Sequence, residues 1–397
     1  MNILFLSRWF PFPVNNGSKL RIYNLLKGLA RHHDVTLLSF ADDTNVALDS
    51  FEIRSMCSEL HVVPWREFDP HSRRARIGFL DQKPRFLLDT YSERMESLIR
   101  NALSLKSYDF IIASQLSMAS YYPCFNGVPA LFEEIELGLF YDNAANSKSI
   151  FKRFRRGLTW FKLQRYLSSL LKSFHVCSVV SEQERQLLVS IFPDQKEKVV
   201  VLPNCVNFDD YQELSITPKP NQLIFSGPFH YRTNYEAMQW FIGEVFPKII
   251  DQLPDTCLVI TGDHADLPLP PAPNIALAGY VDDIKSLVAS SRVSIAPLLS
   301  GGGTRLKILE AMAAGTPVVA TSKGAEGLNA LSGKHLLVAD SPDDFASHIV
   351  ALLKNENLYN KLSVNGKHFV KENYNWQSVM PHFLQLVERS GYGKSTV

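Results

Sequence analysis

The stretch that decides the fold spans residues 300–319 and reads SGGGTRLKILEAMAAGTPVV. One short apolar run, residues 293–297, precedes it, and another, residues 317–321, closes it. Glycines let the backbone approach a bound group closely, and the free N–H groups at the start of a helix favour an anion. The pattern predicts a strand, a glycine-rich loop that cradles a diphosphate, a helix and a further strand. The alternative is an ordinary glycine-rich turn before a solvent-exposed helix.

The predicted helix has one polar face. Thr304, Lys307 and Glu310 are spaced three apart and therefore face one way, while apolar residues between them can face a core. A cation at Lys307, helped by Arg305, would offset charge on a departing diphosphate. A carboxylate at Glu310 would accept hydrogen bonds from both hydroxyls of a ribose.

Short β-branched apolar runs recur on both sides of this stretch, with helical patterns between them. Runs of this kind are typical of strands that are buried on both faces of a parallel sheet. Two series of runs predict an α/β chain with two facing Rossmann-like, doubly wound parallel-sheet domains. The first series is 3–7, 35–40, 60–64, 110–114, 130–134, 176–181 and 199–203, and the second is 223–227, 258–262, 275–281, 293–297, 317–321 and 335–339.

Composition changes mark the domain limits. The apolar rhythm stops after residue 207 and returns at residue 222, which predicts an N-terminal acceptor-side domain over 1–207 and a linker over 208–221. A donor-binding domain would follow over 222–375. Residues 376–397 begin with apolar side chains at helical spacing, so we expect a C-terminal helix packed near the hinge.

Charge and cysteine content narrow the class of protein. The 397-residue chain has 46% hydrophobic residues, 20% charged residues and a formal net charge of +1, so we expect no nucleic-acid partner. Its five cysteines form no C-x-x-C pair, the first residues resemble a buried strand, and no apolar stretch reaches about 18 residues. We therefore expect a cytoplasmic protein without a metal site.

Two further loops follow predicted strands. Residues 225–234 contain Ser226 and Gly227, which are small enough to admit a phosphate, and Arg232, which would clamp it. Residues 9–18 end near Gly17, which would approach the ligand from the other domain. The alternative for Arg232 is a solvated arginine at a helix start, and the alternative for Gly17 is a plain helix entry.

Together these residues resemble the GT-B retaining glycosyltransferases of family 4 and group 1, which act in bacterial polysaccharide and glycoconjugate synthesis. The resemblance covers nearly the whole chain, and the 303–319 segment is similar to the donor signature of that family. Supporting motifs appear in the same order along the chain. They are Val180-Ser181-Glu182, Leu202-Pro203-Asn204-x-Val206, Gly279-Tyr280-Val281-x-Asp283 and Gly324-x-Glu326-Gly327.

The resemblance implies a role for each donor-side position. Glu310 would bind the ribose, Arg305 or Lys307 the diphosphate, and the backbone at Tyr280 and Val281 the base. The stretch from Gly301 through Gly302, Gly303 and Thr304 would lie beside the donor sugar. The co-substrate would be a nucleoside-diphosphate sugar, with no cofactor and no metal, and the sugar would move with retained anomeric configuration.

The chain departs from the family pattern at two places. Gly302 stands where relatives often carry a glutamate, so the donor sugar is less predictable. Many relatives place a histidine at an inner strand end, whereas this chain offers Gln115 after one strand and Glu133, Glu134 and Glu136 at the next. These carboxylates would orient the acceptor hydroxyl or act as a base, and the alternative is a solvated loop rim.

Residues 151–174 interleave basic and apolar side chains, a pattern that suits an anionic membrane surface, with the basic residues between Arg73 and Arg76 adding to it. The alternative is an outer helix with a solvated basic face. With membrane contact, the protein would be peripheral on the inner face of the membrane. The acceptor would be a saccharide or a lipid-linked molecule. Other functions that fit the chain are a GT-B binding protein that has lost activity and a sugar-nucleotide epimerase.

Overall fold

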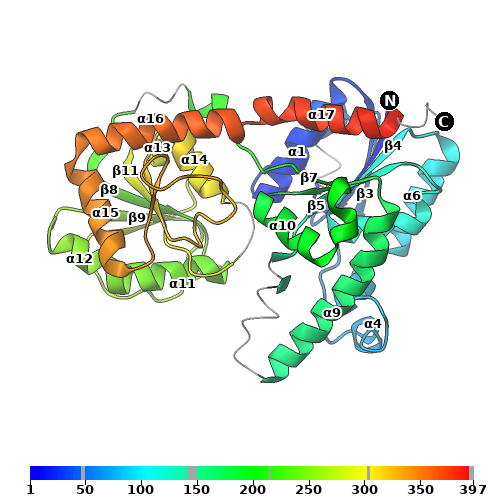
Figure 1. Cartoon of the computed structure of the whole chain (residues 1–397), viewed down its shortest axis with the longest axis horizontal. Helices are drawn as coiled ribbons and strands as arrows, with labels where there is room; N and C mark the ends of the chain where they lie inside the picture. The colour runs from blue at the N-terminus through cyan, green and yellow to red at the C-terminus, as the bar shows by residue number, and fades with distance from the viewer. Residues whose placement is uncertain are drawn as a thin grey trace. The chain divides into compact units, whose positions relative to one another are not determined.

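The computed structural model describes residues 1–45, 50–138, 140–141, 150–212, 214, 216–301 and 305–392. The chain forms two compact units. Unit 1 contains Met1–Pro203 and returns with the residues from Met380 on, while unit 2 contains Asn204–Val379. Each unit has one all-parallel sheet with helices around it, as Figure 1 shows.

The sheet of unit 1 has the strand order β3-β2-β1-β4-β5-β6-β7. The central strand β1 is parallel to both neighbours, with Leu4 opposite Thr36 on one side and Ile111 on the other. Its strands are β1 (Asn2–Ser7), β2 (Asp34–Ala41), β3 (Glu59–Pro64), β4 (Phe110–Ser114), β5 (Ala130–Ile135), β6 (Val176–Val179) and β7 (Val199–Val201).

The helices of unit 1 begin at polar caps. Asn16 accepts a hydrogen bond from the Lys19 backbone at 2.9 Å, and Ser181 accepts one from Glu184 at 3.2 Å, which satisfies donors at helix starts. The helices are α1 (Gly17–Ala30), α3 (Phe51–Met56), α4 (Arg73–Ile77), α5 (Arg85–Asp89), α6 (Glu93–Leu105), α7 (Gln115–Ala119), α9 (Ile150–Ser173) and α10 (Glu182–Ile191), with 3₁₀ turns η1 (Tyr122–Cys124) and η2 (Pro193–Lys198).

The sheet of unit 2 has the order β10-β9-β8-β11-β12-β13. Leu223 and Phe225 face one buried cluster and Ile224 faces another, so the central strand is covered on both sides. Its strands are β8 (Lys219–Ser226), β9 (Cys257–Thr261), β10 (Ile275–Gly279), β11 (Ser291–Ala296), β12 (Val318–Ala320) and β13 (Leu337–Val338).

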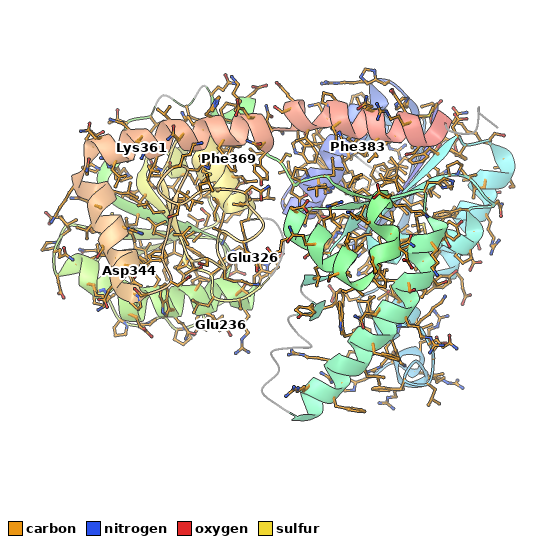
Figure 2. The ribbon with its side chains drawn as sticks, in the orientation of Figure 1. Glu236, Glu326, Asp344, Lys361, Phe369 and Phe383 are labelled. Carbon is orange, nitrogen blue, oxygen red and sulfur yellow. The ribbon has the colours of Figure 1, made fainter. Side chains whose placement is uncertain are left out.

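Helices pack on both faces of this sheet. Figure 2 labels Asp344 on α15 and Phe369 on α16. Phe345 of α15 joins one buried cluster and Phe369 joins the other. The elements are η3 (Phe208–Tyr211), α11 (Arg232–Trp240), the π-helical η4 (Phe241–Val245), α12 (Phe246–Ile250), α13 (Ile284–Ala289), α14 (Leu306–Ala314), α15 (Pro342–Lys354), α16 (Glu356–Asn373) and α17 (Trp376–Tyr392).

Every apolar run predicted as a strand overlaps a strand, although several predicted runs extend past the strand's end, as 335–339 does beyond β13. The α/β fold with two parallel sheets is confirmed. The chain enters unit 2 after Pro203, and the segment expected to be a linker, 208–221, is part of that unit. Phe208 and Tyr211 are buried in its core, and β8 already begins at Lys219. The sequence did not indicate this packing, because the two buried aromatic residues stand among polar ones.

The expected C-terminal helix is α17, whose first residues belong to unit 2 and whose later residues belong to unit 1. In unit 1 it lies so close to α1 that a side chain at Gly28 would overlap the sulfur of Met380. In unit 2, Val206 and Asn375 form a parallel bridge. The chain therefore leaves unit 2 beside the place where it entered.

The loop after β12 depends on close backbone packing. Gly324 donates to Thr321 Oγ1 at 2.8 Å, and a Cβ atom on Gly324 would overlap the carbonyl oxygen of Ala296 at the end of β11. We expect Gly324→Ala to lower the free energy of unfolding of unit 2 by about 1–3 kcal/mol, because backbone must move to relieve the overlap.

Urea denaturation measures this change. The matched control is Gly157→Ala in the middle of α9, where an added Cβ meets no atom within 4 Å. That control should stabilise the protein by about 0.5–1 kcal/mol, as alanine favours a helix interior. Equal effects of the two substitutions would contradict the packing at Gly324.

Candidate functional site

A glycine turn at the carboxyl end of β8 begins the candidate donor site. Ser226 is the last residue of β8, and Gly227 follows with φ +152°, a conformation that L side chains rarely adopt. A Cβ atom on Gly227 would lie 2.7 Å from Asn234 Nδ2 and 2.9 Å from Lys307 Nζ. The absence of a side chain at Gly227 therefore keeps this approach to Lys307 clear.

Lys307 lies in the first turn of α14, and its side chain points toward the glycine turn at Gly227. Its Nζ atom donates to Asn234 Oδ1 at 2.9 Å and lies 4.2 Å from the centre of the Phe225 ring. Burial, and then the charge of Arg305, lower the pKa of Lys307 to about 7. An anion beside Nζ would restore the charged form, so the environment of Lys307 favours an anionic ligand.

Glu310 is one turn further along α14. Burial raises its pKa to about 7, against the opposing effects of Lys307 and Lys285. Burial, and then the nearby Glu310, raise the pKa of the Tyr211 phenol. Lys285 is itself held by Asp210 at 2.5 Å. The turn η3, expected to be linker, therefore forms part of the surroundings of Glu310.

Arg305 precedes α14 and is buried. Its Nη2 atom donates to the carbonyls of Gly301 at 2.8 Å and Lys323 at 3.1 Å, and lies 3.9 Å from Glu326. The guanidinium thus joins the two loops that follow β11 and β12. The diphosphate role expected of Arg305 or Lys307 stays a prediction.

The other predicted donor residues are more scattered. The Arg232 side chain is 86% exposed and bonded at 2.6 Å to Glu236, which Figure 2 labels on α11. Tyr280 is 84% exposed and Val281 half-buried after β10. Gly17 is the first residue of α1 in unit 1. Residues Gly302, Gly303 and Thr304 lie outside the described residues, and all these roles stay predictions.

In unit 1, Glu133 forms a buried ion pair. Its Oε1 atom accepts from Arg21 Nε at 2.5 Å, its Oε2 atom accepts from the Ser114 hydroxyl at 2.6 Å, and both charged side chains are fully buried. Arg21 also donates to the Pro203 carbonyl at 3.1 Å. The expected alternative of a solvated loop rim does not apply to Glu133, and its geometry indicates a structural role.

Gln115 and Glu134 are instead brought together at the ends of β4 and β5. Both adopt positive φ, 68° and 59°, and Gln115 Nε2 donates to Glu134 Oε2 at 2.8 Å. Backbone conformations this costly for non-glycine residues cluster at functional sites. Burial, and then the neighbouring Glu133, raise the pKa of Glu134 to about 8. At neutral pH the Glu134 carboxyl is mostly protonated.

Sequence reasoning missed Arg21, Asn234 and Tyr211. Asn234 lies in the predicted loop over 225–234, and its only signal was a short amide two residues after Arg232. Arg21 is 112 residues away from its partner, which no local pattern reveals. Among the described residues, no group of His, Cys, Asp and Glu side chains suits a metal ion. No helix in that part of the chain has the length and apolar character needed to cross a membrane.

The two adjacent glutamates should respond differently to neutralisation. Glu133→Gln would leave Arg21 as an unpaired buried charge, so we expect it to lower the free energy of unfolding by about 3–5 kcal/mol. Glu134→Gln removes a carboxyl that must gain a proton on folding at pH 7, so we expect it to raise the free energy of unfolding by about 1–3 kcal/mol.

The pH dependence provides the control for this comparison. With a pKa of about 8 in the folded chain, Glu134 keeps a proton that the unfolded chain releases near its ordinary value of 4.5. Its contribution to stability therefore falls as pH rises from about 4.5 to about 8. Urea denaturation at several pH values should show wild type losing stability relative to Glu134→Gln across that window. A constant difference would contradict the raised pKa.

Two known protein families match successive regions of the chain. The family described as Glycosyltransferase Family 4 matches residues 15–210, and the one described as Glycosyl transferases group 1 matches residues 220–355. A 44.6 kDa protein in the cps region of Klebsiella pneumoniae is 22% identical over 95% of this chain and 97% of its own. The phosphatidyl-myo-inositol mannosyltransferase of Mycobacterium tuberculosis H37Rv is 28% identical over 48% of this chain and spans 53% of its own.

Solved structures share the fold at low sequence identity. Sucrose-phosphate synthase from Thermosynechococcus elongatus has a TM-score of 0.69 at 15% identity over the whole of both chains. Anabaena HepE in complex with UDP and glucose has a TM-score of 0.66 at 13% identity, over 98% of this chain and 99% of its own. With both family regions in order along two parallel-sheet units, the chain belongs to the family 4 and group 1 glycosyltransferases of GT-B fold.

Proposed function

We propose that this glycosyltransferase moves a sugar from a nucleoside-diphosphate sugar to an acceptor hydroxyl, with retention of anomeric configuration, in polysaccharide or glycoconjugate synthesis. The observation that carries the proposal is Lys307, a partly buried cation of lowered pKa beside the side-chain-free turn at Gly227. HepE binds UDP and glucose, and the relative from Klebsiella belongs to a cps region, which supports the donor class and the setting.

Charge compensation at the leaving group would come from the protein itself. Lys307, held by Asn234, would take up the negative charge that develops on the departing diphosphate. Arg305 would keep the loops after β11 and β12 in place around it. This arrangement assigns no step to a metal ion or cofactor.

Other side chains would hold the ribose and the acceptor. Ionised Glu310 would accept hydrogen bonds from the ribose hydroxyls. Gln115 and protonated Glu134, which already share a hydrogen bond in unit 1, would orient the acceptor hydroxyl. A proton on Glu134 avoids a second buried negative charge beside Glu133.

The two pKa values near 7 predict a bell-shaped pH dependence of nucleotide binding. Lys307 binds the diphosphate as a cation, so affinity should fall as pH rises above about 7. Glu310 binds the ribose as an anion, so affinity should also fall as pH drops below about 7. Calorimetric titration with the glucose conjugates of UDP, GDP and ADP from pH 5.5 to 9 measures the profile, using the conjugate that binds most tightly, because their diphosphates do not titrate in this range.

Matched variants assign each limb of that profile. Lys307→Arg keeps its charge at all these pH values and should remove the alkaline limb, whereas Glu310→Gln should remove the acid limb. Lys307→Met should weaken binding at pH 7 by about 10- to 100-fold. An acid limb that persists in Glu310→Gln, or wild-type affinity in Lys307→Met, would refute these roles.

We also propose that unit 1 contacts an anionic membrane surface through α9 and residues 73–83. Lys162 of α9 donates to the carbonyls of Gly78 at 3.1 Å and Phe79 at 2.7 Å, which joins α9 to the segment after α4, adjacent in Figure 1. Leu80 is 94% exposed. Other exposed residues of the face are Ile77, Phe79, Phe154 and Phe161 among the apolar ones and Arg73, Arg74, Arg76, Arg153 and Arg155 among the basic ones.

Charge removal on this face should weaken membrane binding. Each basic residue near an anionic surface contributes about 1 kcal/mol, so Arg73→Ala with Arg76→Ala should lower partitioning onto phosphatidylglycerol vesicles by roughly 30-fold. Co-sedimentation with vesicles measures it. The control pair Lys361→Ala with Lys371→Ala, both exposed on α16 of unit 2, should change little. Equal losses in both pairs would argue against a specific face.

A further inference from the structure

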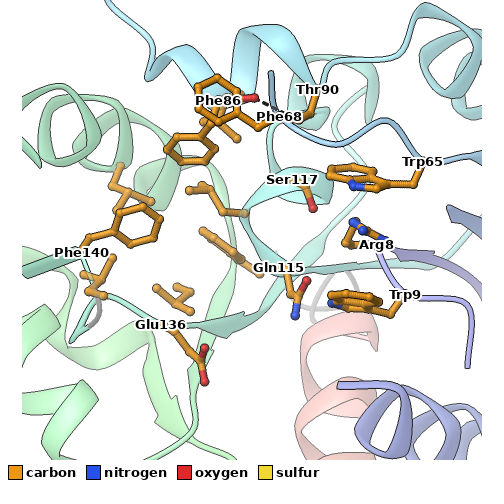
Figure 3. Close-up of a pocket in the computed structure, with 16 residues that line it drawn as sticks. Arg8, Trp9, Trp65, Phe68, Phe86, Thr90, Gln115, Ser117, Glu136 and Phe140 are labelled. Atoms are coloured by element: carbon orange, nitrogen blue, oxygen red, sulfur yellow. Dashed lines mark hydrogen bonds between the residues drawn. The ribbon is translucent and has the colours of Figure 1, made fainter. Parts of the chain in front are cut away.

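Unit 1 contains a pocket of about 370 Å³ that the donor site does not use. It lies where β1, β3, β4 and β5 end, and its volume is within the range of small-molecule sites. Figure 3 shows its two ends, with Arg8, Trp9, Trp65, Gln115 and Ser117 at one and Phe86 and Phe140 at the other. The remaining lining residues are Phe68, Leu87, Thr90, Leu116, Phe132, Ile135, Glu136, Leu137 and Leu167.

Arg8 gives the first end a cation. Its guanidinium lies 4.1 Å from the centre of the Trp9 ring and 3.7 Å from that of Trp65, and Arg8 is only 8% exposed. Its Nη2 atom reaches Asp42 at 3.4 Å, but Nη1 is buried without a hydrogen-bond partner among the described residues. Asp42 is itself half-exposed and compensates the charge weakly.

An unpaired buried donor on a cation favours an anionic ligand group. Burial lowers the pKa of Arg8 to about 10, so the guanidinium stays charged at neutral pH. Stacking against two indole rings fixes its plane but satisfies none of its N–H groups. A phosphate oxygen would supply the missing acceptor. Glu136, also in the lining, is exposed and lies apart from Arg8 in Figure 3.

The second end is almost entirely carbon. Phe86 and Phe140 are stacked with ring centres 5.6 Å apart, and Leu137 and Leu167 lie in the same lining. The Thr90 hydroxyl is already donated to the Phe86 carbonyl at 2.8 Å. A sugar ring would leave its hydroxyls without partners here, at a cost in free energy. A hydrocarbon chain has no such requirement.

Gln115 connects this pocket to the acceptor side of the proposed reaction. It lines the pocket and also donates to Glu134. We propose that the pocket binds an amphiphilic phosphate, with the phosphate at Arg8 and the hydrocarbon chain against Phe86 and Phe140. Given the proposed transfer reaction, on which this assignment rests, the acceptor is a lipid-linked molecule that carries both this phosphate and the hydroxyl that receives the sugar.

Direct binding tests the pocket without donor chemistry. The full chain is titrated by calorimetry with farnesyl phosphate, farnesol and inorganic phosphate, each below its aggregation concentration. We expect farnesyl phosphate to bind about 10- to 100-fold more tightly than farnesol, because it adds a charge-assisted hydrogen bond, and inorganic phosphate to bind weakest. Equal affinities of farnesyl phosphate and farnesol, or no binding of either, would overturn the proposal.

Variants locate the two groups of the ligand. Arg8→Gln should reduce the affinity for farnesyl phosphate to that for farnesol and leave the affinity for farnesol unchanged. Arg66→Gln, an exposed arginine close in sequence, is the matched control and should bind as wild type does. An unchanged affinity in Arg8→Gln would overturn the role of Arg8. Should Arg8→Gln fail to fold, the three-ligand comparison on wild type still decides.

Two further titrations identify the kind of lipid phosphate that binds and test whether its binding depends on the donor site. Tighter binding of farnesyl phosphate than of dihexanoyl phosphatidic acid would support an isoprenyl phosphate, and the reverse order would support a glycerolipid. Lys307→Met should bind farnesyl phosphate as wild type does while losing nucleotide. A wild-type chain that binds farnesyl phosphate but no nucleotide would count against the transfer reaction, whereas one that binds nucleotide but no farnesyl phosphate would count against the pocket.

Discussion

The ion pair between Arg21 and Glu133 is the interaction on which unit 1 depends. It joins α1 to β5. Glu133 also accepts a hydrogen bond from Ser114 at the end of β4, and Arg21 donates one to the carbonyl of Pro203, the last residue of the unit's first segment. Two charges that are fully buried tolerate neither the loss of a partner nor a change of register. The strand ends that carry Gln115 and Glu134 are therefore held at fixed positions. The strained backbone at both residues is maintained by the packing around that pair.

Three buried or partly buried cations differ in how fully they are compensated. Arg21 has a buried carboxylate at 2.5 Å, Lys307 has a neutral amide at 2.9 Å, and Arg8 has a half-exposed carboxylate at 3.4 Å. Full compensation stabilises structure, whereas partial compensation leaves a cation able to gain from an anionic ligand. The fold thus separates a structural charge from two that suit ligand binding.

Much of the fold follows from local patterns, because strands buried on both faces must be short continuous apolar runs and both series show them. The glycine-rich stretch before α14 likewise indicated the family and the helix that carries Lys307 and Glu310. Other features depend on distant partners and could not be predicted. Glu133 was expected at the reaction centre because its pairing with Arg21 leaves no local signal. The segment around Tyr211 was expected to be linker, since its two buried aromatic residues stand among polar ones.

Unit 1 is discontinuous, because α17 returns to it after the whole of unit 2. During synthesis, the first 203 residues leave the ribosome without the helix that packs beside Gly28 of α1. At the usual rate of about 5–20 residues per second, that face of α1 is uncovered for on the order of ten seconds or more. Unit 2 is one continuous stretch, Asn204–Val379, so all of it is made before the residues from Met380 on that complete unit 1. The N-terminal half of the chain is therefore the later of the two to mature.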